Sequence, residues 1–177
     1  MKNIKILVTR KWPKAVEEML LKTFDTTLNL SDKPLTEKEL YNAMIDFDAL
    51  LPTVTDKITD KIMSSPDKRV KIIGNFGVGF NNIDIESAKT NNLVVTNTPE
   101  VLTDCTADIA MLLMLGVARR AGEGEPLVRD NKWDGWRPTH MMGTKVTGKT
   151  LGLIGMGRIA QAMAKKSHHG FDMEILF

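Results

Sequence analysis

The sequence predicts an α/β fold with parallel sheets: a flavodoxin-like unit over residues 1–99, then the beginning of a second sheet within residues 100–177. Three observations support this prediction. Short apolar runs alternate with amphipathic segments from the start of the chain, which is the pattern of parallel strands joined by helices. After Thr98-Pro99 a long helical segment follows with no strand of its own before it. The alternation resumes at Thr150.

The first unit has five predicted strands with helices between them. The run from Ile4 to Val8 has the length of a strand, and Pro13 is well suited to the start of the helix after it. Thr36 and Glu39 have the spacing of a capping box, and Asp84 is placed to cap another helix. In chain order we predict strands at 4–8, 27–30, 49–51, 70–74 and 93–96, and helices at 14–22, 36–45, 58–64 and 85–90.

The second unit begins with a long predicted helix over residues 103–120. Its apolar stretch 109–118 is too short to span a bilayer and is predicted to be buried. Gly122 and Gly124 should end the helix, and loops with short helices should follow to about residue 143. A strand, a helix ended by Gly170 and a second strand over 173–177 come last. Two strands are too few for a doubly wound domain, so an incomplete domain is predicted.

A glycine motif, Gly155-Met156-Gly157-Arg158-Ile159-Ala160, directly follows the strand that begins at Thr150. It fits the G-x-G-x-x-G/A turn that binds a dinucleotide pyrophosphate. Gly155 permits the sharp turn, and Gly157 has no side chain to obstruct the pyrophosphate. The N–H groups at the start of the next helix would face the phosphates. A βα turn without a ligand can share this spacing, but the flanking strand and helix favour a Rossmann nucleotide site.

The residue that distinguishes NAD from NADP should lie about 20 residues after the motif, at the carboxyl end of the second strand. Glu174 has nearly this spacing, but it is predicted at the opposite end of that strand. The deciding residue is therefore expected beyond Phe177. The predicted cofactor is NAD or NADP.

A second glycine-rich loop, Asn75-Phe76-Gly77-Val78-Gly79, follows a predicted parallel strand. Open α/β sheets bind their ligands at the carboxyl ends of strands, and successive N–H groups in such a loop can form an anion-binding concavity. On spacing alone, a glycine turn without a ligand explains the loop equally well.

The composition argues against several classes of partner. The net charge is only +2 and no basic block occurs, so no nucleic-acid partner is predicted. The chain has neither a signal-peptide core nor a membrane-length apolar run, so no membrane partner is predicted. Cys105 is the only cysteine, which excludes an internal disulfide and suits a cytoplasmic protein. Cys105 is expected to be a packing residue, and no metal site is predicted.

Five motifs occur in an order that resembles the D-isomer-specific 2-hydroxyacid dehydrogenase family, and within it the glyoxylate/hydroxypyruvate reductases. The resemblance covers the whole chain. Three departures are modest: Asn81 stands where many relatives have Asp, Cys105 where Ala is common, and Ala160 where the third Gly is usual. The motifs are residues 77–84, 95–99, 101–108, 148–152 and 155–159.

This resemblance implies hydride transfer between C4 of a nicotinamide and C2 of a small 2-oxo or 2-hydroxy acid, such as glyoxylate or hydroxypyruvate. It implies that backbone N–H groups of the loop at Val78 and Gly79 bind the substrate carboxylate, and that the position of Thr106 lies near the nicotinamide. The substrate-binding residues implied are Leu51, Gly77, Val78 and Gly79. The cofactor-binding residues implied are Thr106, Gly155, Met156, Gly157, Arg158 and Ile159.

The family's catalytic Arg, Glu and His belong to segments expected beyond Phe177, so no catalytic residue is predicted within the chain. His140 has no recognisable acid partner, and His168 and His169 are placed to cap helix carbonyls. We therefore expect an amino-terminal portion of a dehydrogenase, with turnover by this chain alone doubtful. Uncovered apolar surface should lead to a homodimer or to aggregation.

Two alternative functions stay open. One is a nucleotide-binding or subunit-interaction module derived from the same family. The other is a generic Rossmann protein such as a methyltransferase, against which the glycine-rich loop before the nucleotide motif argues.

Overall fold

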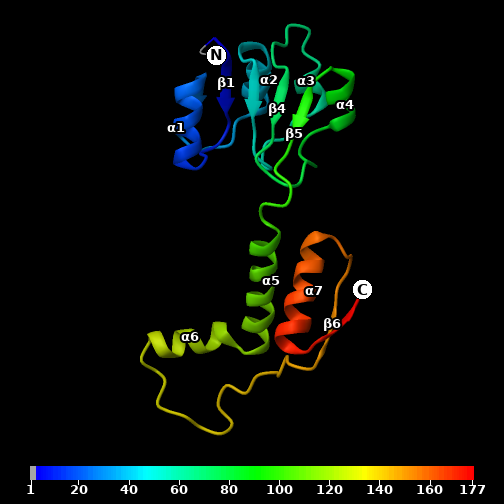
Figure 1. The fold of residues 1–177 in the computed structure, drawn as a ribbon. Coiled ribbons are helices and arrows are strands. Elements are labelled where there is room, and N and C mark those ends of the chain that lie inside the picture. Colours follow the sequence, from blue (N-terminus) through cyan, green and yellow to red (C-terminus); the bar gives the residue numbers. More distant parts are fainter. Residues whose placement is uncertain (1–2) are drawn as a thin grey trace. The chain divides into compact units, whose positions relative to one another are not determined.

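The computed structural model describes residues 3–177 and has the predicted α/β fold with parallel strands (Figure 1). The chain divides into two compact units, Met1–Pro99 and Glu100–Phe177. Each unit has its own sheet and is described separately below.

The first unit is built on a five-stranded sheet in which every neighbouring pair is parallel. The strand order is β2-β1-β3-β4-β5, which is the flavodoxin order. All carboxyl ends therefore lie at one edge of the sheet, and the loops after neighbouring strands meet there. The strands are β1 (Lys5–Val8), β2 (Asp25–Leu28), β3 (Ala49–Leu51), β4 (Ile72–Gly74) and β5 (Val94–Thr96).

Four helices connect these strands, and the two predicted caps are confirmed. The Thr36 side chain accepts a hydrogen bond from the Glu39 N–H at 3.3 Å, and the Glu39 carboxylate accepts one from the Thr36 N–H at 2.7 Å. The Asp84 carboxylate accepts from the Ser87 N–H at 2.9 Å. The helices are α1 (Lys14–Thr23), α2 (Glu37–Asp46), α3 (Asp60–Met63) and α4 (Ile85–Thr90).

The main core of this unit lies between one face of the sheet and helices α2, α3 and α4. Met44 of α2, Leu50 of β3 and Ile73 of β4 are fully buried in it. Toward the β5 edge the opposite face is less covered, since Ile72 and Val94 are 39% and 57% exposed. The core therefore lies against a face of the sheet, between the strands and these helices.

The second strand begins and ends two residues earlier than predicted. Helix α1 ends where the Phe24 N–H donates to the Leu20 carbonyl, and the Asp25 N–H then donates to Ile4. Pairing with β1 therefore starts at Asp25, and Leu30 lies outside the strand with 89% of its surface exposed. The other predicted elements of this unit agree with the structure to within two residues at each end.

The second unit has three helices and one pair of parallel strands. Helix α5 packs along α7, and the two lie side by side in Figure 1. The Lys166 ammonium on α7 joins them through Asp108 at 2.7 Å and Asp104 at 3.2 Å on α5. The elements are α5 (Thr103–Ala118), α6 (Ala121–Arg129), β6 (Thr150–Gly152), α7 (Arg158–Phe171) and β7 (Glu174–Leu176).

The prediction that the apolar stretch 109–118 is buried is wrong. Ala107 is the only fully buried residue of α5, because α7 covers one side of this helix and its apolar side chains extend around the others. Cys105, expected as a packing residue, is exposed as well. Four large side chains of α5 are more than half exposed: Ile109, Leu112, Leu113 and Val117.

The predicted helix breaks are also displaced. Helix α5 ends at Ala118, and two residues later Arg120 adopts a left-handed backbone with φ of 56°. Gly122 and Gly124 lie inside α6. Helix α7 continues through Gly170 and ends before Asp172, which is left-handed with φ of 49°. Asp172 and Arg120 thus supply the helix-ending conformations that the sequence assigned to glycines.

Candidate functional site

The glycine-rich loop lies at the carboxyl end of β4, beside the end of β3. Leu51 is the last residue of β3 and is half-buried. The Phe76 N–H donates to the Pro52 carbonyl at 2.8 Å, and Thr53 and Phe76 form an isolated parallel bridge. The parallel sheet therefore brings Leu51 and the loop to the same edge, the edge at which open α/β sheets bind ligands.

The loop presents N–H groups that the protein itself does not use. Within residues 3–177, the N–H groups of Val78 and Gly79 donate to no protein acceptor. Gly79 is exposed and Val78 half-buried, so these donors lie at the surface of the unit. Adjacent unpaired N–H groups of this kind can accept an anion such as a carboxylate.

The two glycines of the loop have different surroundings. A Cβ atom at Gly77 would lie 2.4 Å from Val54 Cγ1, so the neighbouring segment leaves no room for a side chain. A Cβ atom at Gly79 would meet no atom within 4 Å. The first glycine is explained by packing within the protein, whereas the second leaves open space over the loop.

A buried carboxylate that was not predicted from the sequence forms hydrogen bonds at the carboxyl ends of β1 and β3. Asp56 is 2% exposed, and its Oδ2 accepts from the Thr9 hydroxyl at 2.6 Å and from the Thr53 N–H at 2.8 Å. These bonds join the ends of β1 and β3. The signal in the sequence was a single Asp after an apolar strand, which has no motif of its own.

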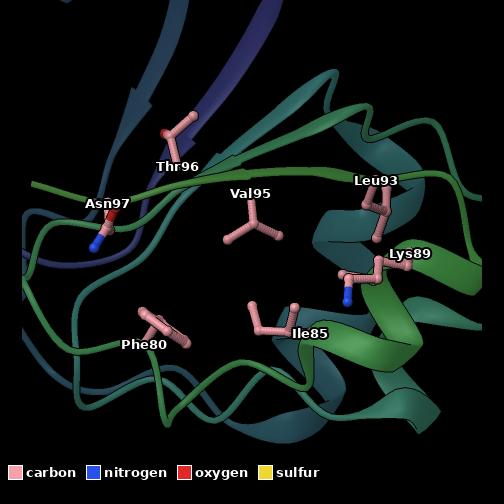
Figure 2. A pocket seen from close by; sticks show the side chains of 8 residues that line it. Phe80, Ile85, Lys89, Leu93, Val95, Thr96 and Asn97 are labelled. Atoms are coloured by element: carbon pink, nitrogen blue, oxygen red, sulfur yellow. The ribbon is translucent and has the colours of Figure 1, made fainter.

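One loop residue belongs to an aromatic pair, and the residue after the loop lines an apolar cavity. The ring of Phe76 lies 4.9 Å from the ring of Trp12, centroid to centroid. A separate cavity of about 300 Å³ lies between β5 and α4. Figure 2 shows the side chains of Phe80, Ile85 and Val95 directed into it. Its lining is mainly apolar, with Lys89 as the one charged side chain, so its chemistry differs from that of the loop.

The second predicted site is the turn between β6 and α7. Gly155 has a φ of 87°, which a residue with a side chain adopts only with strain. Gly157 precedes α7 as its N-cap, and a Cβ atom there would meet nothing within 4 Å. Gly155 is therefore required by the backbone conformation, while Gly157 leaves open space beside the start of the helix.

The first turn of α7 is free of capping. No side chain caps this 14-residue helix, and the N–H groups of Arg158 and Ile159 donate to no acceptor within the described residues. The exposed Arg158 guanidinium lies 3.4 Å from the Glu100 carboxylate. Open N–H groups, a helix dipole and a nearby cation together suit an anionic phosphate.

The remaining predicted cofactor residues belong to the same unit. The Met156 carbonyl accepts a hydrogen bond from the Gln161 side chain at 3.0 Å, and Ile159 is half-buried in the first turn of α7. Thr106 is exposed in the first turn of α5, the helix that packs along α7. The cofactor-binding roles implied for Met156, Ile159 and Thr106 stay predictions.

None of the three histidines is paired with a carboxylate in the part of the chain that the structure describes. His140 Nδ1 lies 3.1 Å from the Arg137 guanidinium, and His168 Nδ1 lies 3.0 Å from the Met173 carbonyl. His169 packs edge-on against His168, with ring centroids 5.0 Å apart. Among residues 3–177 there is no cluster suited to a metal ion, and no helix has the length and apolar character needed to cross a membrane.

Comparison with known proteins gives matches over nearly the whole chain. The family model for the D-isomer specific 2-hydroxyacid dehydrogenase, catalytic domain, matches residues 6–172. The chain is 41% identical to a glyoxylate reductase of Thermococcus litoralis, covering 98% of this chain and 53% of that protein. It is 39% identical to a glycerate dehydrogenase of Hyphomicrobium methylovorum, covering 99% and 54%. The chain therefore spans about half the length of the curated relatives it matches.

The fold has a close counterpart among crystal structures. A Polaromonas sp. JS6 66 protein, described as a D-isomer specific 2-hydroxyacid dehydrogenase, NAD-binding, superposes with a TM-score of 0.88 at 36% identity. The match covers 97% of this chain and 54% of that one.

Proposed function

Because the chain belongs to the D-isomer-specific 2-hydroxyacid dehydrogenase family, we propose that it supplies the substrate-carboxylate and pyrophosphate sites of an NAD- or NADP-dependent oxidoreductase. The substrate proposed is a small 2-oxo acid such as glyoxylate or hydroxypyruvate, which is reduced at C2. The names of the glyoxylate reductase and glycerate dehydrogenase relatives support this substrate class.

The carboxylate site proposed is the loop after β4. The observation that carries it is the pair of surface N–H groups at Val78 and Gly79 that donate to no described acceptor. Gly79 keeps the space above them open, and Leu51 would line the same pocket from the end of β3. A carboxylate held by backbone N–H groups is fixed in orientation, so C2 of the acid would be presented in a defined direction.

The pyrophosphate site proposed is the turn from Gly155 to Ile159. The uncapped start of α7 and the open space at Gly157 fit a diphosphate, and Arg158 adds a positive charge. The nicotinamide of the bound cofactor supplies the hydride. Thr106, at the start of α5, is proposed to lie near that ring.

Binding and orientation are the roles that the described residues can fill. Among residues 3–177, no carboxylate is paired with His140, His168 or His169, as a general-acid histidine would require. We therefore expect the 177-residue chain to bind nucleotide without turning over substrate. Steady oxidation of NADH or NADPH by the purified chain in the presence of glyoxylate would contradict this expectation.

We also propose that the protein forms a homodimer in the cytoplasm. The large exposed apolar side chains of α5 support self-association, because such a surface is unfavourable in water. The single cysteine, free and exposed, suits a reducing compartment.

The nucleotide site is tested by fluorescence titration with NADH and NADPH. We expect saturable binding of at least one of them, weakened about tenfold by Gly157→Ala, whose new methyl group would enter the phosphate space. Gly170→Ala is the matched control, because a Cβ atom there also meets nothing within 4 Å but lies at the far end of α7. Absence of binding by both nucleotides would refute the proposed site.

A further inference from the structure

The carbonyl groups of three consecutive loop residues, 77–79, are all held by donors outside these three residues. Each accepts one hydrogen bond, and two of the three donors are asparagine side chains. The bonds are Thr98 N–H to Gly77 at 3.0 Å, Asn97 Nδ2 to Val78 at 2.9 Å and Asn75 Nδ2 to Gly79 at 2.9 Å.

Holding these carbonyls fixes the direction of the N–H groups. In a trans peptide unit the C=O of one residue and the N–H of the next point in opposite directions. No described peptide bond is cis, so the N–H groups of Val78, Gly79 and Phe80 are directed away from the three donors. Like the other two, the N–H of Phe80 donates to no described acceptor. The loop therefore offers three N–H groups, those of Val78, Gly79 and Phe80, that donate to no described acceptor.

A third asparagine sets the orientation of the first. Asn75 is 2% exposed, and its Oδ1 accepts a hydrogen bond from Asn82 Nδ2 at 3.1 Å. The same Nδ2 donates to the carbonyls of Thr53 and Asp56, both at 3.1 Å. If the Asn75 amide were reversed, its NH₂ group would face the Asn82 NH₂ group, donor against donor. Asn82 therefore keeps Asn75 Nδ2 turned toward Gly79.

We propose that Asn75, Asn82 and Asn97 are positioning residues of the carboxylate site, and that the N–H of Phe80 is its third donor. This inference rests on the proposed function of the loop and deepens it. Asn97 acts directly on the Val78 carbonyl, and Asn82 acts through Asn75 without a hydrogen bond to residues 77–79. The asparagines themselves need not contact the substrate.

The test is ¹H–¹⁵N NMR of the 177-residue chain titrated with glycolate, a 2-hydroxy acid, and with glycolamide, its uncharged counterpart. Asn97→Ala is the main variant, since Asn97 is only half-buried and begins a loop. The matched control is Asn91→Ala. Asn91 is half-buried like Asn97, and its Nδ2 makes two hydrogen bonds, both to Ser87 within the α4 region.

We expect glycolate, but not glycolamide, to shift the amide resonances of Val78, Gly79 and Phe80 together. Asn97→Ala and Asn82→Ala should each weaken glycolate binding about tenfold, while Asn91→Ala should leave it within about twofold. A purely structural role would lower stability in all three variants without separating their affinities. Unchanged affinity in Asn97→Ala would overturn the positioning role, and a stationary Phe80 resonance would remove the third donor.

A second readout needs no ligand. The heteronuclear NOE of residues 78–80 should fall in Asn97→Ala and stay constant in Asn91→Ala, because only the first variant releases a loop carbonyl. If glycolate fails to bind the unaltered chain, the proposed substrate site fails, and this NOE alone decides the positioning role. Reduced NOE values would then support it, and unchanged values would overturn it.

Discussion

Two neighbouring glycines, Gly77 and Gly79, differ in what an added methyl group would meet. At Gly77 it would clash with Val54 Cγ1, which must move, whereas at Gly79 it would enter open space. We predict that Gly77→Ala lowers the free energy of unfolding by about 1 kcal/mol. Gly79→Ala should leave stability nearly unchanged and weaken glycolate binding. Urea unfolding and the NMR titration measure the two effects, and equal stability losses would contradict the distinction.

Gly155 is required by its backbone rather than by its neighbours. Its φ of 87° lies in a region that residues with a side chain adopt only with strain, although a Cβ atom would meet nothing within 4 Å. We predict that Gly155→Ala costs about 1 kcal/mol of stability in urea unfolding. Gly152→Ala, at a glycine with equal space and no positive φ, should be neutral or slightly stabilising. Equal costs would refute this explanation.

At the scale of single residues, the sequence indicated the glycine loops but not what supports them. Gly155 and Gly157 stand out because their spacing matches a turn with a known physical purpose. Asn75, Asn82 and Asn97 carry no such pattern. Asn82 bonds to Thr53 and Asp56, 29 and 26 residues away, and Asn97 bonds to Val78, 19 residues away, so these contacts depend on segments that only folding brings together. Long-range partners of this kind have no period or spacing that a sequence could display.

Among the strands, Asp48 links three segments at the start of β3. Its Oδ2 accepts from the Lys5 N–H at 2.7 Å, and its Oδ1 accepts from Arg69 Nε at 2.6 Å. The Arg69 hydrogen bond, followed by that from Lys5, lowers the pKa of Asp48 below its ordinary value of 3.8. Because the folded-state pKa is the lower one, the charged carboxylate stabilises the fold above pH 3.8, and this contribution is lost as the pH falls through the folded-state pKa.

We therefore predict that Asp48→Asn lowers the melting temperature at pH 7. The difference from the unaltered chain should shrink as the pH falls below about 3.8, where protonation removes the same charge in the unaltered protein. Asp67→Asn is the control, since Asp67 is exposed and makes no hydrogen bond or ion pair within the described residues. A difference that stays constant from pH 7 to pH 3 would show that the carboxylate charge is not the cause.

At the scale of elements, the sequence predicted the type and order of the helices and strands better than it predicted the residues at which they end. The capping box at Thr36 was readable because both of its partners lie within four residues. The end of α5 could not be read from the sequence, because it depends on a contact with a segment much later in the chain. The Thr144 N–H donates to the Ala118 carbonyl at 2.7 Å, so a residue far along the chain helps to end the helix. Local glycines therefore gave the wrong position.

For the whole molecule, the alternation of strands and helices was enough to predict parallel sheets and the flavodoxin-like first unit. The degree of burial was not predictable in the same way. An apolar helix is normally covered, and the sequence alone gave no reason to place Ile109 or Val117 at the surface. Burial of such a helix depends on which other segments pack against it, whereas periodicity is a property of the segment itself.

The exposed side of α5 leads to the last prediction. Leu112 and Leu113 are 62% and 61% exposed on a helix that carries further uncovered apolar side chains, so contact with a second copy would remove this surface from water. We predict that the chain sediments as a dimer or larger species in analytical ultracentrifugation, and that Leu112→Glu together with Leu113→Glu shifts it toward monomer, because charges would be costly to bury in the contact.

Leu30→Glu is the control for this experiment. Leu30 is 89% exposed in the first unit but belongs to no comparable group of apolar residues on one helix, so its replacement should leave the association unchanged. If the unaltered chain sediments as a monomer over a wide concentration range, α5 is not an interface between copies. If Leu30→Glu dissociates the dimer as effectively as the α5 variant, the contact lies elsewhere on the molecule.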